Sequence, residues 1–232
     1  EADRQRTALL AAVGHDIRTP LAAIKAAATT LRQTDIAWSG EERDALLETI
    51  EGSTDRLEGV VANLLDASRL QAGALAVRPG PVALDEVVAG ALLALPAEPS
   101  AVEVHVPDDL HLVTADRGLL QRVLVNLIDN ALRHGGDRPV EVRAHIGGES
   151  AKLEVIDHGR GATEEEHARM FEPFQQLGDR GGENAGVGLG LAVAKGFVEA
   201  MNGAMMADTT PGGGLTMRVR LPLAPGKDEA PE

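Results

Sequence analysis

The sequence contains no cysteine and no tyrosine, and only three phenylalanines and one tryptophan among its 232 residues. Without cysteine there can be no disulfide, no thiolate metal site and no cysteine nucleophile, and the chain suits a reducing compartment. With so few aromatic rings, a hydrophobic core must be built from Leu, Val, Ile and Ala, a composition that favours packed helices.

Basic residues are outnumbered, 22 Lys and Arg against 36 Asp and Glu, which gives a formal net charge of −14. This excess of negative charge argues against a nucleic-acid backbone or an anionic membrane surface as the main partner. Long apolar runs are also missing: the longest, VVAGALLALPA (87–97), is shorter than the roughly 18 residues that span a bilayer. There is no signal peptide, and Glu1 falls within a helical pattern. We therefore expect a fragment of a longer protein that itself makes no membrane contact.

Apolar residues spaced by three and four predict two helices within 1–73, separated by the turn TDIAWSGEE (34–42). The second helix ends at Gly73. Two such helices form a hairpin whose apolar seam stays half exposed, so we expect a homodimer in which two hairpins build a four-helix bundle. The apolar positions are Leu10, Val13, Ile17, Leu21, Ile24, Ala28 and Leu31 in the first helix, and Leu46, Ile50, Leu57, Val60, Val61, Leu64 and Leu65 in the second.

A linker with two prolines and a glycine, 74–82, separates the hairpin from a predicted α+β domain, 83–223. The polar tail, 224–232, is expected to be disordered. Within the domain we expect helices near 84–95, 116–134 and 187–202, and strands near 102–106, 110–114, 141–146, 152–157, 204–209 and 215–221.

The stretch GHDIRTPLAAIK (14–25) places a titratable ring inside the first helix. If Ile17 and Ile24 occupy the apolar seam, His15 falls outside it, and Pro20 removes a backbone hydrogen bond to the turn containing Asp16. Two interpretations stay open on this stretch alone: an ordinary surface histidine, or a nucleophilic imidazole oriented by the adjacent carboxylate. A metal site is poorly supported, because no second histidine lies three or four residues away.

The helix LLQRVLVNLIDNALRHG (119–135) gathers polar residues on one side of an apolar cylinder. One interpretation is ordinary capping or hydrogen bonding between helices. The other is a set of amide oxygens for a Mg²⁺ that also holds phosphate, flanked by guanidinium groups. The residues that share an arc of roughly 100° are Arg122, Asn126, Asp129, Asn130 and Arg133.

Three further motifs follow in order. VIDHGRGA (155–162) ends a strand with a carboxylate that can accept a hydrogen bond from an amino group such as that of adenine. FEPF (171–174) holds two of the three phenylalanines, and GVGLGLAVAKG (186–196) has glycines opening into a helix, an arrangement that binds anions. No P-loop GxxxxGK[ST], early Rossmann glycine motif or eukaryotic kinase motif set is present.

Taken in order, GHDIRTP, NLIDNALRHG, DHGRG, FEPF and GVGLGL resemble the H, N, G1, F and G2 boxes of bacterial sensor histidine kinases, over about residues 7–222. Within that family, the hairpin and the phrase GVGLGLAVAKGFVEAMNG are most similar to potassium-responsive sensor kinases of the Kdp type. The resemblance implies a multi-domain fold: an all-α dimerisation and histidine-phosphotransfer hairpin, followed by an α+β sandwich of the Bergerat (GHKL ATPase) type.

The resemblance also implies a role for each matching residue. His15 would be the phosphoacceptor, Asp16 the acid/base that orients it, and Thr19 would help to place water for dephosphorylating a response regulator. Asn126 and Asn130 would bind Mg²⁺ and phosphates, Arg133 would contact phosphate and Asp157 would bind the adenine amine. The other implied nucleotide-binding residues are His134, Gly159, Gly161, Phe174, Gly186, Gly188, Leu189 and Gly190.

The expected function is ATP-dependent autophosphorylation of His15 and transfer to an aspartate of a response regulator, with regulator phosphatase activity. The chain would be the cytoplasmic part of a membrane-anchored sensor. The alternative is a non-catalytic dimeric regulator in which nucleotide only sets the shape of the hairpin. A serine-directed or ATP-hydrolysing relative is disfavoured by the HDIRTP hairpin. This chain has His158 where the family often has Asn, and Arg133 where it usually has Lys.

Overall fold

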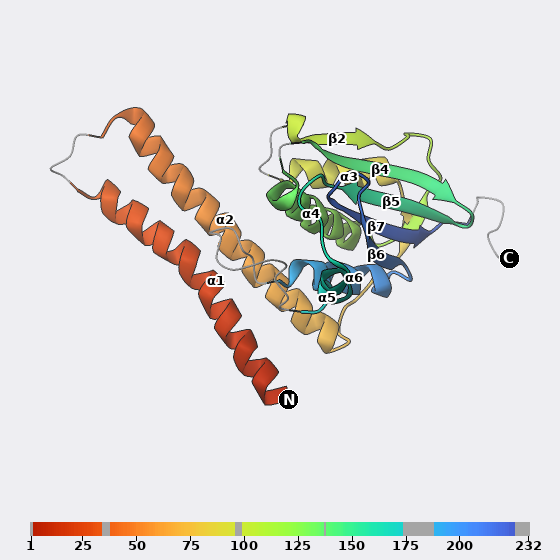
Figure 1. The fold of residues 1–232 in the computed structure, drawn as a ribbon, viewed down its shortest axis with the longest axis horizontal. Coiled ribbons are helices and arrows are strands. Elements are labelled where there is room, and N and C mark those ends of the chain that lie inside the picture. The colour runs from red at the N-terminus through yellow and green to blue at the C-terminus, as the bar shows by residue number, and fades with distance from the viewer. Residues whose placement is uncertain (1, 34–37, 96–98, 137, 174–187, 226–232) are drawn as a thin grey trace.

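The computed structural model of the chain describes residues 2–33, 38–95, 99–136, 138–173 and 188–225. Helices α1 (Ala2–Leu31) and α2 (Gly40–Gln71) form the predicted hairpin, at the left of Figure 1. Helix α1 continues through Pro20. Helix α2 begins at a capping box in which the Ser39 hydroxyl accepts from the Glu42 N–H and the Glu42 carboxylate accepts from the Ser39 N–H.

A five-stranded sheet forms the centre of the second domain, in the order β2-β4-β5-β7-β6. The first pair, β2 with β4, is parallel and the others are antiparallel. The strands are β2 (Val102–His105), β4 (Val140–Gly147), β5 (Ser150–Ile156), β6 (Ala204–Thr209) and β7 (Leu215–Pro222).

Three helices, α3 (Leu84–Leu93), α4 (Arg117–His134) and α6 (Gly190–Ala200), cover the face of the sheet that is turned toward the hairpin (Figure 1). Their apolar sides meet those of the strands in one core of Leu, Val, Ile, Ala and Met; among the described residues Phe197 is the one buried phenylalanine, and the partly buried Phe171 packs against the core. The predicted aliphatic core is thereby confirmed. The opposite face of the sheet carries ion pairs, including Arg218 with Glu154 and Asp208.

The structure differs from the sequence expectations in four places. The end of the expected linker forms β1 (Gly80–Val82), which pairs antiparallel with β3 (Val113–Ala115). The expected tail is ordered at Ala224, whose N–H donates to the Leu112 carbonyl at 2.7 Å. A short helix, α5 (Glu164–Arg169), and a 3₁₀ turn, Pro99–Ala101, were not predicted.

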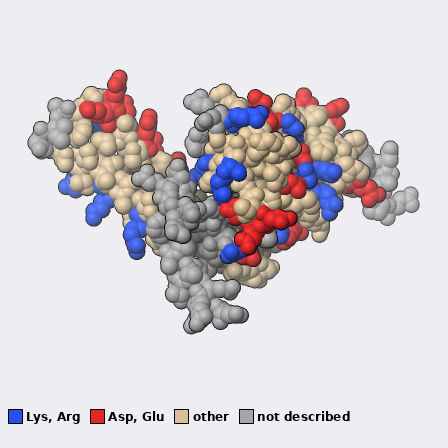
Figure 2. All heavy atoms as spheres, viewed as in Figure 1, with Lys and Arg blue, Asp and Glu red and all other residues tan. Residues whose placement is uncertain are grey.

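Charge is distributed unevenly over the surface. Figure 2 shows basic side chains along the visible edge of α1, acidic ones over the first turns of α2, and a dense acidic cluster over α5, where Glu164, Glu165 and Glu166 lie. The hairpin also exposes Leu21 and Leu65, each 54% accessible. Within the described part of the chain, no helix is both long and apolar enough to cross a membrane.

Candidate functional site

Helix α4 carries the asparagine pair. It begins at Asp116, whose Oδ1 accepts from the N–H groups of Gly118 and Leu119. Its apolar side is buried, with Ile128 fully inaccessible, and this fixes the rotation of the helix. Asn126 and Asn130 consequently lie half-buried on another side.

Asp157 lies directly after β5 and is only 4% exposed. Its Oδ1 accepts two backbone hydrogen bonds of 3.0 Å, from the N–H groups of Gly159 and Leu215. These bonds hold the carboxylate in one orientation, with Oδ2 taking no part in either of them. A carboxylate fixed in this way is an acceptor whose position is set before any ligand arrives.

Glycines crowd around Asp157 and its neighbour. A Cβ built on Gly214 would lie 2.1 Å from the Asp157 carbonyl oxygen, and one on Gly159 would lie 1.8 Å from the His134 carbonyl oxygen. A Cβ on Gly135 would be 3.2 Å from that of Asp157. No side chain fits at these positions, so backbone walls surround the carboxylate. A flat heterocycle with an amino group fits this arrangement.

The second half of the site is the start of α6. Its first residue, Gly190, lies against α4, where an added Cβ would be 3.3 Å from Asn126 Oδ1. Gly188 has a positive φ of 69°, and no side chain caps this helix end. Asn126 and the uncapped N–H groups of an 11-residue helix thus lie next to one another, an arrangement that suits a phosphate chain.

Arg133 and His134 end α4 beside Asp157. The Arg133 Nε–H donates to both carboxylate oxygens of Asp129, at 3.0 and 2.9 Å. Partial burial of its ring lowers the pKa of His134 from the usual 6.5, and the charge of Arg133 lowers it further. The His134 ring is therefore neutral at pH 7, able to stack on or hydrogen-bond a base without adding charge.

On the hairpin, Asp16 is 4% exposed and Thr19 is exposed. His15 lies between Gly14 and Asp16 in α1, and its side chain is outside what the structure describes. Phe174 and Gly186 also lie outside the described residues. Phe171, in the same motif as Phe174, is half-buried and has the Lys195 ammonium 5.0 Å from its ring centre.

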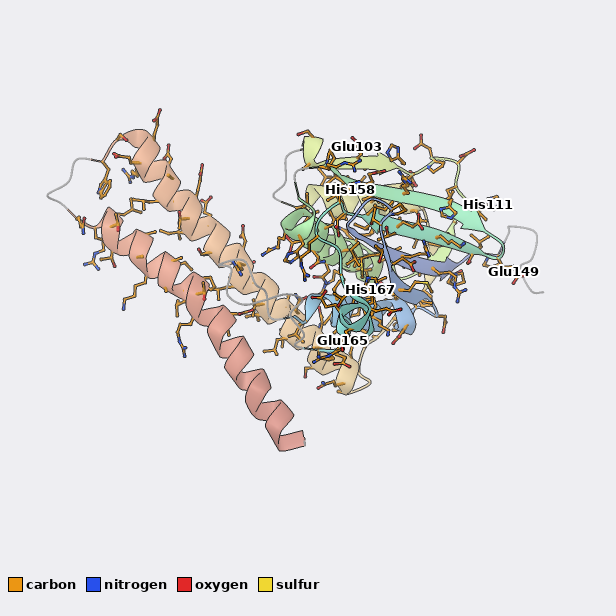
Figure 3. The ribbon with its side chains drawn as sticks, viewed as in Figure 1. Glu103, His111, Glu149, His158, Glu165 and His167 are labelled. Carbon is orange, nitrogen blue, oxygen red and sulfur yellow. The ribbon has the colours of Figure 1, made fainter. Side chains whose placement is uncertain are left out.

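Leu189 differs from the other glycine-motif residues. Its side chain, 1% exposed, packs in an apolar cluster with Val60 of the hairpin. Two other contacts were missed from the sequence. His158, labelled beside β4 in Figure 3, lies with its Nε2 3.0 Å from Glu141 Oε1, and Arg122 pairs with Asp66 of α2. Asp66 could have been noticed as an acidic residue within the apolar run NLLDA (63–67).

Comparison with known families accounts for most of the chain. Residues 5–73 match the His Kinase A (phospho-acceptor) domain, and residues 115–225 match the histidine kinase-, DNA gyrase B- and HSP90-like ATPase domain. The two matches include the asparagine pair, Asp157 and the start of α6 in one domain, and His15, Asp16 and Thr19 in the other.

Individual relatives agree with the family matches. Sensor protein KdpD of Mycobacterium tuberculosis is 46% identical over 228 residues, 95% of this chain and 26% of the relative. KdpD of Escherichia coli is 35% identical over 224 residues, 96% of this chain and 25% of the relative. The chain therefore spans about a quarter of the length of these relatives.

A solved structure, full-length ShkA in complex with AMPPNP, superposes with a TM-score of 0.63 at 28% identity, over 94% of this chain and 46% of that one. The two family matches cover the hairpin and most of the second domain. The chain belongs to the sensor histidine kinases, as a phospho-acceptor hairpin joined to a histidine kinase-type ATPase domain, and within that family it is similar to KdpD.

Proposed function

We propose that the chain transfers the γ-phosphoryl group of ATP to His15 and then passes it to an aspartate of a response regulator. The single observation that carries this proposal is the buried Asp157 carboxylate, held by two backbone N–H groups and closely surrounded by glycine backbone. The Asp157 carboxylate accepts a hydrogen bond from the adenine amino group, and the start of α6 binds the phosphates. The complex of ShkA with AMPPNP supports nucleotide binding by this fold.

Phosphoryl transfer from ATP to His15 requires little covalent participation by other residues of the protein. A ring nitrogen of His15 attacks the γ-phosphorus, the bond from that phosphorus to the β,γ-bridging oxygen breaks, and ADP leaves with the electron pair. Phosphoryl transfer of this kind depends mainly on positioning and charge neutralisation. Asp16 orients the imidazole and takes up its proton, while Arg133 neutralises charge on the phosphates.

Asn126 and Asn130 are the residues that would hold Mg²⁺, through amide oxygens, with phosphate oxygens completing its coordination. The fit rests on the place of Asn126 beside the uncapped start of α6 and of Asn130 one turn further along α4. The described residues contain no cluster of three or more His, Asp or Glu that would hold a metal by itself. Such a metal therefore needs the phosphates as ligands, which suits an ion that arrives with its nucleotide.

The partners follow from the exposed parts of the hairpin. The apolar side chains Leu21, Leu47, Val61 and Leu65 remain accessible, and we infer that they pack against a second hairpin in a homodimer. A response regulator receives the phosphoryl group, and Thr19 helps to place the water that later removes it. The hairpin (1–73) and the ATP-binding domain (83–223) would form the cytoplasmic part of a membrane-anchored sensor of the Kdp type.

The test is incubation with γ-labelled ATP and Mg²⁺, comparing the wild type with His15→Gln. Acid-labile, base-stable label that is absent from the variant, with ATP affinity unchanged, is the expected result, because a phosphoramidate forms only on the imidazole. A wild-type chain that binds ATP but incorporates no label would overturn the kinase assignment and favour a nucleotide-gated regulator.

A further inference from the structure

The nucleotide-binding domain is docked on the hairpin of its own chain. The contact nearest to the nucleotide site is made by Leu189, which lies between two glycines of the phosphate-binding motif. Its side chain forms a small buried cluster with Val60 of α2, against which Ile17 of α1 and Leu64 of α2 pack. Ile17 is two residues from His15, so the edge of the phosphate-binding motif reaches the segment of α1 that carries the phosphoacceptor.

A charged contact between α4 and α2 supports the same docking. Arg122, one helical turn before Asn126, donates through Nη1 to Asp66 Oδ1 at 3.0 Å and through Nη2 to Asp66 Oδ2. The Asp66 side chain is 2% exposed. Arg122 also lies over the ring of Phe197, 5.4 Å from its centre. A buried carboxylate that loses its partner is strongly destabilising, so this pair selects one docked arrangement.

Helix α6 extends the contact toward the end of α2. A Cβ built on Gly196 would be 2.7 Å from Leu70 Cδ1 and 3.5 Å from its Cγ. From Val60 to Leu70 the interface follows α2 for about 15 Å, at 1.5 Å per residue. The three contacts join one face of α2 to the nucleotide-binding motifs of the same chain.

The pairing of the two hairpin helices locates His15 along this interface. A groove in the hairpin is lined by Thr19 and Ala23 of α1 and by Gly52 and Arg56 of α2, as antiparallel helices require. Continuing that register places the backbone of residue 15 opposite Val60. Since Val60 also contacts Leu189, the phosphate-binding end of the domain lies at the height of the chain's own His15.

We propose that autophosphorylation occurs in cis: the ATP-binding domain phosphorylates His15 of the chain to which it belongs, and Asp66, Arg122 and Leu189 position it for that reaction. This inference rests on the proposed kinase function and specifies which histidine of the homodimer is the acceptor. It adds three positioning residues that do not themselves touch the reacting atoms.

The test uses mixed dimers that pair a His15→Gln chain with an Asn130→Asp chain, purified through two different affinity tags. One chain then lacks the acceptor and the other lacks a working ATP site. Phosphorylation in cis leaves the mixed dimer with no more label than either variant homodimer. Phosphorylation in trans restores half of the wild-type label, all of it on the Asn130→Asp chain, and would overturn the proposal.

A second measurement tests the docking without using activity. Because the chain has no cysteine, Leu70→Cys/Gly196→Cys introduces a single pair, and Leu70→Cys alone is the control. Mild oxidation should produce an intrachain disulfide that migrates as a monomer and is reversed by reductant. A disulfide between chains, or none at all, would contradict docking on the own hairpin. If the double-cysteine variant forms its intrachain disulfide but the wild type incorporates no label from ATP, the docking stands and the kinase function is contradicted.

Discussion

The backbone of Gly214 passes so close to Asp157 that a Cβ on Gly214 would lie 2.1 Å from the Asp157 carbonyl oxygen. Gly214 precedes β7, and Asp157 follows β5, the neighbouring strand. The close approach is what allows the Leu215 N–H to reach the Asp157 carboxylate. The orientation of the proposed adenine acceptor thus depends on the absence of a side chain on the adjacent strand.

Gly214→Ala is therefore expected to disturb both the fold and the nucleotide site. The positive φ of 113° costs about 1 kcal/mol for alanine, and the steric overlap adds about 1–3 kcal/mol. Gly212→Ala is the matched control, because its φ is also positive, 91°, but its Cβ would meet nothing within 4 Å. The unfolding temperature, measured by circular dichroism, should fall clearly more for Gly214→Ala than for Gly212→Ala. Equal decreases in unfolding temperature for the two variants would mean that the loss of stability comes from the backbone angle alone.

Asp157→Asn should separate binding from folding. Asparagine keeps an oxygen for the two backbone N–H donors but replaces the second carboxylate oxygen by an NH₂ group, which repels an amine. Losing a hydrogen bond to a charged group costs about 1.5–3 kcal/mol, so the ATP affinity should fall by about tenfold to a hundredfold. Isothermal titration calorimetry with ATP and GTP checks this. Unchanged ATP affinity in a folded variant would refute the adenine assignment.

Much of this architecture could be predicted because its signals are local. The stripes of α1 and α2 and the five motifs lie within short stretches, and the helix after Asp116 was expected almost to the residue. Helix α5 was missed although Thr163 and Glu166 form a capping box at the required spacing, because the helix has too few residues to show a period. Strand β1 was also missed, because it contains Pro81 and because its partner β3 lies more than 30 residues away along the chain.

The interface between the two domains could not be predicted in the same way. Asp66 and Arg122 are 56 residues apart, and no pattern in either helix identifies its partner. Asp66 sits beside apolar residues, where an unpaired carboxylate is costly, but several arginines could have satisfied it. Likewise, the family resemblance implied a nucleotide contact for Leu189, whereas its side chain packs with Val60 of the hairpin.

The ion pair leads to a prediction about domain docking. Arg122→Met leaves the Asp66 carboxylate beside an apolar side chain, with Arg69 Nη1 at 3.8 Å as its remaining charged neighbour. The cost should be about 2 kcal/mol, below the 3–5 kcal/mol of fully buried pairs, because 41% of the Arg122 side chain is exposed. The domain is then expected to leave the hairpin, which raises the radius of gyration measured by small-angle X-ray scattering. Asp66→Leu/Arg122→Met removes both charges and should restore docking; a double variant as extended as Arg122→Met would contradict this account.

The pair of Glu141 and His158 predicts a pH dependence. The hydrogen bond from His158, followed by the contribution of Arg143, lowers the pKa of the Glu141 carboxyl from its usual 4.5. A carboxyl with a lowered pKa stabilises the fold fully above its unfolded pKa and loses that effect as the pH falls through the folded value. The wild type should exceed Glu141→Gln in stability at pH 7, with the difference shrinking below about pH 4.5. Glu149→Gln, in an exposed turn, controls for the change in net charge, and a pH-independent difference would reject the assignment.

Thr19 tests the phosphatase role separately from the kinase role. Its exposed hydroxyl lines the hairpin groove one turn after His15, where a water molecule could be placed against the phosphorylated aspartate of a bound regulator. Thr19→Ala should therefore leave autophosphorylation unchanged while slowing dephosphorylation of the regulator by about tenfold, the lower range for loss of a group that assists proton transfer or positioning. Thr49→Ala is the matched control, because Thr49 of α2 is an exposed threonine that lines the same groove. If both variants slow the regulator's dephosphorylation equally, the groove acts through its shape, and the hydroxyl of Thr19 has no special part in placing water.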